Sequence, residues 1–306
     1  MKKRLPALVA VLVLLNVLWF VLFRTSPSPT PGAFTVDLEG LRATADAGVE
    51  KLPTDIRVLH LADGALPGFF VIAGGASGSL PAVYSAFQVV MPDAGAVIID
   101  TAYDRTGWEA IDGKLSNFHD DAFVQLEKAM LASSAIVLTH EHPDHIGGVA
   151  RSKHAVALAK GPLRMTKEQV DFALAESKTG FTKEAAAALT PITYDKLFRV
   201  APGVALQRAP GHSPGSQLIY VRRADGKELL FVGDIAWNQV SIDQQRMRPL
   251  AASLFLGEQR QPVIDQLGAL HQLQAEHPEV QLVIAHDADG LARLVASGAV
   301  REGFIE

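Results

Sequence analysis

The chain has 306 residues, of which 48% are hydrophobic, so it can bury a sizeable core and is not an intrinsically disordered protein. Four of the 28 basic residues lie in the first 24 positions, so the rest of the chain carries 24 basic against 33 acidic side chains, and we expect no nucleic-acid partner for such an acidic body. The absence of cysteine excludes disulfides, thiolate ligands and cysteine nucleophiles, so any transition-metal site must use His, Asp and Glu.

An apolar stretch runs from Leu5 to Phe23. As a helix it would be about 28 Å long at roughly 1.5 Å per residue, which is long enough to cross a bilayer. Lys2, Lys3 and Arg4 precede it, and the positive-inside rule therefore leaves the N-terminus in the cytoplasm. The pattern predicts a single-pass protein of the inner or plasma membrane, with the folded domain on the extracytoplasmic side.

The same stretch has two other interpretations, a cleaved signal peptide and a buried core helix. A signal peptide usually has a shorter apolar region and ends at a small-x-small site, but no Ala-x-Ala sequence follows Phe23. A core helix would have a polar face, which this stretch lacks. We therefore expect residues 1–24 to form an uncleaved membrane anchor, with a transmembrane helix.

Residues 25–33 are rich in proline and serine. Such a segment cannot sustain a helix and is predicted to be a stiff, extended linker. The remaining residues, 34–306, contain no internal repeat and no second low-complexity break, so a single domain is the simplest division.

The first half of this domain begins with short runs of β-branched and aromatic residues separated by Gly, Pro and Asp, which is the pattern of successive strands. The predicted strands are Ile56–Leu61, Gly68–Ile72, Ala86–Met91 and Ala96–Ile99. A helix with apolar periodicity follows over 121–132, and a buried-type strand over 135–138.

The second half alternates strands with helices. Thr166 and Gln169 have the spacing of a capping box ahead of a helix, and an alanine-rich helix follows over 183–189. Strands are predicted over 218–221, 229–232 and 282–284, with a helix over 263–276. This order predicts an α+β fold in which helices cover two sheets, an αββα sandwich.

The densest group of chemically active residues is the loop His140-Glu141-His142-Pro143-Asp144-His145, directly after the strand that ends at Leu138. Histidines two apart on a turn can converge on one ion, while Asp144 and His145 can reach a second ion about 3.5 to 4 Å away. A solvated polar loop does not need this density of ligands, so the loop is predicted to bind metal.

This loop resembles the His-x-His-x-Asp-His hallmark of the metallo-β-lactamase superfamily. The resemblance extends over roughly residues 56 to 290, through Ala209-Pro210-Gly211-His212, Gly233-Asp234, Ala285-His286-Asp287 and the early strand that ends at Asp100. It implies that His140, His142 and His212 hold one ion, and that Asp144, His145 and His286 hold the other. It also implies that Asp234 bridges the two ions and that Asp100 supports the ligands from behind.

The ligand set suits zinc, two ions per chain, although iron or manganese could occupy the same ligands. Two cations that share a carboxylate lower the pKa of a bridging water, so the resemblance implies a dizinc-bridged hydroxide that attacks a small-molecule substrate. Asp144 is expected to have a catalytic role as well, since it can steer that nucleophile and relay its proton.

Within the superfamily, the motifs are most similar to the branch of lactonases and organophosphate hydrolases. The lactonases carry a tyrosine three residues after the bridging aspartate, and Trp237 stands there in this chain. A tryptophan cannot donate a phenolic hydrogen bond, which weakens the case for a lactone, and Trp237 is predicted to be a hydrophobic wall of the pocket.

The predicted function is zinc-dependent hydrolysis of a small ester, lactone or phosphoester. One alternative is an iron-dependent oxidoreductase of the persulfide dioxygenase kind on the same fold. Another is a non-catalytic envelope protein that uses the fold for binding, although such a protein would have no need of Asp234. The sequence leaves the substrate and the oligomeric state open.

Overall fold

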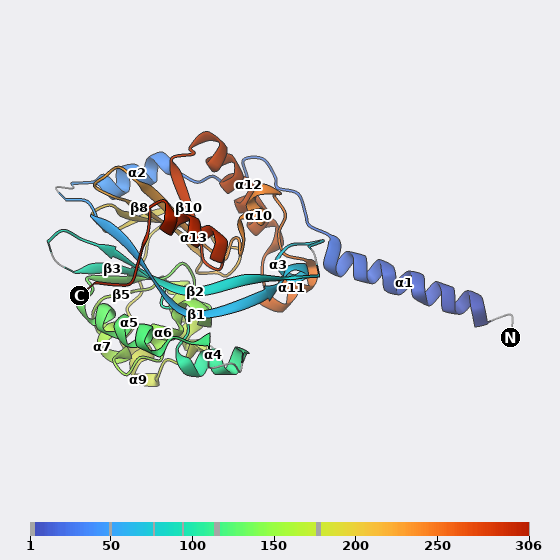
Figure 1. Ribbon diagram of the computed structural model, residues 1–306, viewed down its shortest axis with the longest axis horizontal. Helices are drawn as coiled ribbons and strands as arrows, with labels where there is room; N and C mark the ends of the chain where they lie inside the picture. The colour runs from blue at the N-terminus through green and yellow to red at the C-terminus, as the bar shows by residue number, and fades with distance from the viewer. Residues whose placement is uncertain are drawn as a thin grey trace.

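Two β-sheets packed face to face form the centre of the protein, which we describe from a computed structural model over residues 4–48, 51–75, 77–93, 95–112, 117–175 and 179–305 (Figure 1). The first sheet has the spatial order β11 (Arg301–Glu302), β1 (Asp55–Pro67), β2 (Ser79–Val90), β3 (Ala96–Ile99), β4 (Ala135–Val137) and β5 (Leu163–Arg164). The second has the order β10 (Val280–Ile284), β9 (Glu228–Gly233), β8 (Gln217–Arg222), β7 (Val204–Arg208) and β6 (Leu197–Ala201).

Helices cover the outer face of each sheet (Figure 1). Against the first sheet lie α4 (Arg105–Asp112), α5 (Asp120–Ala132), α6 (Pro143–Ala150), α7 (Ala155–Lys160) and α8 (Lys167–Ala175), and α9 (Lys183–Ala188) packs on α7 and α8. Against the second lie α2 (Leu38–Asp46), α10 (Gln239–Asp243) and α12 (Arg260–Glu276). The remaining helices are α1 (Arg4–Arg24), α3 (Gly68–Val71), α11 (Leu250–Leu256) and α13 (Ala288–Ala296), of which α13 contacts β10 and β2.

The buried apolar side chains form three layers. One lies between the two sheets, where Phe87 of β2 meets Phe231 of β9 with ring centroids 5.0 Å apart. A second lies between the first sheet and its helices, around Trp108 and Met130, and a third between the second sheet and α2 and α12, around Leu41. An αββα sandwich has four layers of secondary structure, two of helices and two β-sheets, with an apolar core between each neighbouring pair. The three cores match this arrangement, so this part of the predicted fold is confirmed.

The strands that precede the motif residues run parallel in pairs. β3 is parallel to β4, and β9 is parallel to β10. Because the carboxyl ends of parallel strands lie at the same edge of a sheet, the residues that follow each pair come out side by side. This topology brings the loops after β3 and β4 to one edge of the first sheet, and the loops after β9 and β10 to one edge of the second.

The apolar N-terminal run does form a helix, α1, which projects from the domain (Figure 1). Its last turns pack on the domain, since the ring of Phe23 lies 6.1 Å from that of Phe69. No helix within the described ranges combines the length and the hydropathy that a bilayer crossing requires, so the predicted transmembrane helix is wrong. At its C-terminal end Leu22 and Phe23 are partly buried against the domain, whereas the described side chains from Leu8 to Val21 are exposed.

Two of the three basic residues on which the orientation depended, Lys2 and Lys3, lie outside the described residues. The location of the domain outside the cytoplasm stays a prediction.

Residues 25–33 run along the surface of the domain. The backbone N–H of Thr30 donates to Asp265 Oδ1 at 2.7 Å, and Gln261 donates to the carbonyl of Ser28 at 3.1 Å. Both partners belong to α12. Residues 25–30 have no helix or strand, and the chain then turns, with Ala33 N–H donating to the carbonyl of Thr30 at 3.1 Å and Gly32 at φ 74°. The segment is therefore hydrogen-bonded to the domain and is not extended over its whole length.

The predicted strand at Gly68–Ile72 is wrong. Gly68 to Val71 form the short helix α3, inside the connection between β1 and β2, which is closed by a 2.7 Å hydrogen bond from Gly68 N–H to the carbonyl of Gly78. Tertiary packing decides this segment: Phe69 packs against Phe23 of α1, and Phe70 against Trp237.

Candidate metal centre

Asp100 ties together the backbone and the side chains behind the site. It follows β3 in the left-handed region, at φ 55°, and is buried. Its carboxylate accepts from the Thr139 backbone N–H and from the Thr139 hydroxyl, both at 2.7 Å, and Oδ2 lies 2.9 Å from Nδ1 of His145. With Nδ1 facing Asp100, the other ring nitrogen of His145 is turned toward the motif residues, as expected for a supporting aspartate.

We expect Asp100→Ala to lower the free energy of unfolding by about 3 kcal/mol, because it leaves buried donors of Thr139 and His145 without an acceptor. Chemical denaturation would measure the change. Asp100→Asn is the matched variant, since its amide oxygen can still accept from the Thr139 N–H, and it should lose less. Equal stability of Asp100→Ala and the native chain would contradict this supporting role.

The hallmark loop leads directly into α6. His142 precedes the helix and Pro143 occupies its first turn, where the missing N–H of proline has no cost. Gly148 then lets α6 lie against the end of β3: a Cβ at this position would meet the carbonyl oxygen of Thr101 at 2.1 Å. The glycine therefore sets how closely the loop approaches Asp100.

Three histidines from two different loops form what we call the histidine group: His140, His142 and His212. Nε2 of His140 lies 3.1 Å from Nδ1 of His142, and Nε2 of His212 lies 2.9 Å from the same atom. His140 and His212 are buried, and His142 is partly exposed. Three imidazole nitrogens therefore converge on one point.

A second set, the mixed group, consists of Asp144, His145, Asp234 and His286. Its ligand atoms all lie within 4.8 Å of one another. Nε2 of His286 lies 3.2 Å from Asp144 Oδ2, and its Nδ1 is 3.0 Å from the carbonyl of Val83. The structure thus brings all seven predicted ligands together, in the two groups that the resemblance implies.

Asp234 lies between the two groups and faces each with a different oxygen. Its Oδ2 is 3.4 Å from Nε2 of His212 and 3.9 Å from Nε2 of His140. Its Oδ1 is 3.3 Å from Nε2 of His145 and 3.2 Å from Nε2 of His286. A carboxylate in this orientation can bridge two cations.

The chemistry of these residues fits a pair of divalent ions. His145 Nε2 and Asp234 Oδ1 are buried and have no hydrogen-bond partner within the described residues, although they face each other. Buried polar atoms without partners are costly, and ions coordinated between the two groups would satisfy them. Imidazole and carboxylate without thiolate is a donor set suited to zinc, iron or manganese.

The protonation of the histidines differs between the groups. Burial, together with the neighbouring His212, lowers the pKa of His142 to about 4, so this imidazole is neutral and ready to bind a cation. Burial also lowers the pKa of His145, but Asp100, Asp144 and Asp234 outweigh it and raise that pKa to about 10. A cation in the mixed group would therefore displace a proton from His145.

Trp237, predicted as a hydrophobic wall, has a polar contact as well. Its indole N–H donates to Asp234 Oδ2 at 2.6 Å, and its ring lies 6.3 Å from that of His286. Phe70 packs 6.3 Å from Trp237 on one side and 6.3 Å from Phe255 on the other. Phe255 is 81% exposed, so a row of aromatic rings leads from solvent to the candidate ligands.

Sequence reasoning missed Arg248, Glu258 and the role of Glu141. Glu258 Oε1 lies 2.7 Å from Nδ1 of His212, and burial would raise its pKa, but the charge of Arg248 holds it at about 2. Glu141 is buried within the hallmark loop, where it accepts from the Ser213 hydroxyl at 2.9 Å. Its place between two predicted ligands could have pointed to it, whereas no motif surrounds Arg248 or Glu258.

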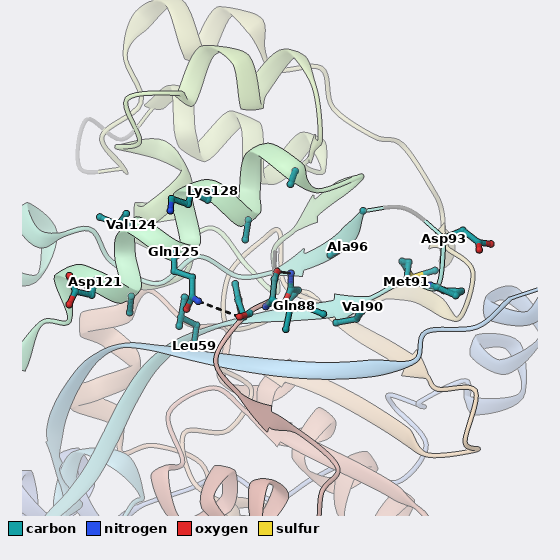
Figure 2. Close-up of a pocket in the computed structure, with 17 residues that line it drawn as sticks. Leu59, Gln88, Val90, Met91, Asp93, Ala96, Asp121, Val124, Gln125 and Lys128 are labelled. Atoms are coloured by element: carbon teal, nitrogen blue, oxygen red, sulfur yellow. Dashed lines mark hydrogen bonds between the residues drawn. The ribbon is translucent and has the colours of Figure 1, made fainter.

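A cavity of about 860 Å³ lies away from the histidine group and the mixed group (Figure 2). It is lined by α5 and by strands β1 to β3, with Val124 and Lys128 on the α5 side and Gln88 on β2. Gln88 and Gln125 hydrogen-bond to the backbone of the C-terminal segment, at 2.9 and 3.3 Å. None of the seven candidate ligands lines it, so it takes no part in the candidate metal centre.

Comparison with known proteins supports the resemblance to the metallo-β-lactamase superfamily. The family model described as the metallo-beta-lactamase superfamily matches residues 82–286, more than half of the chain. No curated protein sequence gives a significant match.

Solved structures with a similar fold include an N-acyl homoserine lactone hydrolase with the product N-hexanoyl-L-homoserine bound at its catalytic metal centre, with a TM-score of 0.61 and 15% identity over 79% of this chain and 96% of that one. AidC, a dizinc quorum-quenching lactonase, has a TM-score of 0.57 and 16% identity over 79% of this chain and 91% of that one. A probable metal-dependent hydrolase from Staphylococcus aureus has a TM-score of 0.60 and 13% identity over 78% and 91%.

At these identities the solved structures show the fold alone, and the predicted likeness to lactonases is confirmed at that level. The family itself is shown by the match over residues 82–286, which includes all seven candidate ligands. The chain belongs to the metallo-β-lactamase superfamily.

Proposed function

We propose that the protein is a two-metal hydrolase, with zinc in both positions, that cleaves a small ester, lactone or phosphoester. The observation that carries the proposal is the orientation of Asp234, which turns one oxygen to the histidine group and the other to the mixed group. A single-ion protein would have no use for two separate ligand groups that share a carboxylate.

When bound, two such cations would polarise the scissile carbonyl or phosphoryl group and lower the pKa of a water molecule between them. The chain itself supplies orientation and proton transfer. The side chain of Asp144 is 18% exposed, against 3% for Asp234, so Asp144 is the carboxylate of the mixed group that substrate and water can reach. It can accept the proton of the attacking water.

The walls of the site favour a substrate with an apolar group beside the scissile bond. Phe70 and Phe255 form the outer part of the aromatic row and have no polar group to offer. Trp237 donates its only N–H to Asp234 and is not free to bind an oxyanion of the substrate. Esters and phosphoesters therefore fit the site at least as well as lactones. Lactones are included among the substrates to be tested because several solved structures with this fold are lactonases.

The proposal is tested with the full-length protein, freed of metal and then reloaded with Zn²⁺, Mn²⁺ or Fe²⁺. Aryl esters, N-acyl homoserine lactones and aryl phosphoesters are offered to each form. We expect hydrolysis of at least one class that requires two ions per chain and follows metal content. Two bound ions with no hydrolysis of any class would contradict the proposal, as would oxygen consumption by the iron form with a persulfide.

A further inference from the structure

Each ligand group contains one histidine whose outer ring nitrogen meets a buried carboxylate. In the mixed group this histidine is His145, backed by Asp100. In the histidine group it is His212, whose Nδ1 lies 2.7 Å from Oε1 of Glu258. The side chains of His212 and Glu258 are 1% and 0% exposed, so water does not compete for this contact.

The backbone brings Glu258 to His212 through the turn that joins α11 to α12. Gly257 ends α11 in the left-handed conformation, at φ 74°, and Glu258 N–H then donates to the carbonyl of Ser253 at 3.0 Å. The next N–H, of Gln259, donates to the carbonyl of Gly211 at 2.9 Å. The turn is therefore hydrogen-bonded to the same loop that carries His212.

Arg248 holds this carboxylate in place from the other side. It hydrogen-bonds to Glu258, donates to the backbone carbonyl of Asp234 at 2.7 Å, and lies 4.6 Å from the centre of the Trp237 ring. Its side chain is 2% exposed. The guanidinium thus neutralises Glu258 and links it to the aspartate that faces both ligand groups.

These contacts decide which nitrogen of His212 carries the proton. Arg248 also approaches His212 Nδ1, but at 3.4 Å, whereas Glu258 lies at 2.7 Å. A carboxylate can only accept, so Nδ1 must donate to it. The lone pair is then left on Nε2, which faces His142 at 2.9 Å and Asp234 at 3.4 Å.

We propose that Glu258 is a positioning residue for the ion held by the histidine group: it fixes the tautomer and the ring orientation of His212, and Arg248 keeps it in place. The inference rests on the proposed two-metal site, but it concerns metal affinity and does not depend on the substrate. A carboxylate behind a metal-bound histidine strengthens binding of the metal by about 10- to 100-fold in known sites.

The test is the affinity of full-length Glu258→Gln for Zn²⁺. Metal-free protein is titrated with Zn²⁺ against a chromophoric chelator, which yields a dissociation constant for each ion. We expect one of the two constants to rise by about 10-fold or more, with the other within about threefold of the native value. Glu168→Gln is the matched control, since it removes the carboxylate partner of Arg208 outside the site and should leave both constants unchanged.

A second variant keeps the test informative if Glu258→Gln does not fold by circular dichroism. Glu258→Asp retains the charge that Arg248 requires but shortens the reach to His212, so it should weaken the same ion by a smaller factor. The His212 Nδ1–H resonance, expected downfield in the native protein because of the carboxylate, should shift upfield in either variant.

Native affinity for both ions in a folded Glu258 variant would overturn the proposal, and so would an equal weakening of both ions. Failure of the proposed function alone has a different result: the native protein would bind two ions, and the Glu258 variants would weaken one of them, without hydrolysis of any substrate. A native protein that binds fewer than two ions would overturn both ideas. The two ideas are therefore tested by separate measurements.

Discussion

Asp234→Ala is expected to abolish metal-dependent hydrolysis, with a fall in kcat/KM of about 10⁴-fold, or roughly 5 kcal/mol of transition-state stabilisation. The reason is that both carboxylate oxygens face ligand groups, at 3.2 to 3.4 Å from histidine nitrogens on each side. One substitution therefore removes a ligand from both ions. Steady-state hydrolysis of an aryl ester and the metal content of the purified variant measure the effect.

Two further variants separate loss of the bridge from loss of packing. Asp234→Asn keeps the volume and can still accept from the Trp237 indole, so it should fold like the native chain and still be inactive. Asp63→Ala removes an exposed aspartate that pairs with His119 outside the site, and it should retain full activity. Native turnover by Asp234→Ala would show that this carboxylate does not hold the ions.

Removal of the ions is expected to lower the thermal midpoint by about 8 °C for each ion, as well as to stop hydrolysis. Ligands that bind only the folded state stabilise it by about 4 kcal/mol at a thousandfold excess over their dissociation constant, and 1 kcal/mol corresponds to about 2 °C in a domain of this size. In the absence of ions, the buried atoms of His145 and Asp234 are also left without partners. Differential scanning calorimetry before and after chelation, and after Zn²⁺ is restored, gives the shift.

His142→Ala is the matched variant for this measurement. His142 is partly exposed and makes no side-chain cap for α6, and the ring contacts that it loses are those with His140 and His212, so the substitution should cost the metal-free protein about 1 kcal/mol. It removes one of three ligands from the histidine group, so the increase in midpoint on adding Zn²⁺ should shrink and hydrolysis should be lost. A native response to Zn²⁺ would contradict the assignment of His142 as a ligand.

The N-terminal helix shows where hydropathy is an incomplete guide. A run of apolar residues predicts a helix, and α1 is one. The same run does not say whether the helix will lie in lipid or against protein, because both environments accept apolar side chains. Phe23 contacts Phe69, which lies 46 residues away in the sequence, so this contact could be found only from the tertiary structure.

Local pattern was sufficient for most of the sandwich. β3, β4, β9 and β10 were readable as apolar runs bounded by Gly, Asp and His, because buried strands need continuous apolar side chains. The capping box at Thr166 is also confirmed, with Gln169 bonded to the Thr166 N–H at 3.0 Å. These features depend on neighbours in sequence.

The sequence by itself pointed to the loop His140–His145, because that density of ligands after a strand is local chemistry, and its resemblance to the superfamily supplied His212, Asp234 and His286. Only the tertiary structure decided how they are supported: that Asp234 faces two groups, that Trp237 donates to it, and that Glu258 and Arg248 stand behind His212. Those contacts join loops far apart in the chain. Their geometry depends on how α12 packs against the second sheet and α11 against α1 and α3, which side-chain volumes across the whole domain determine.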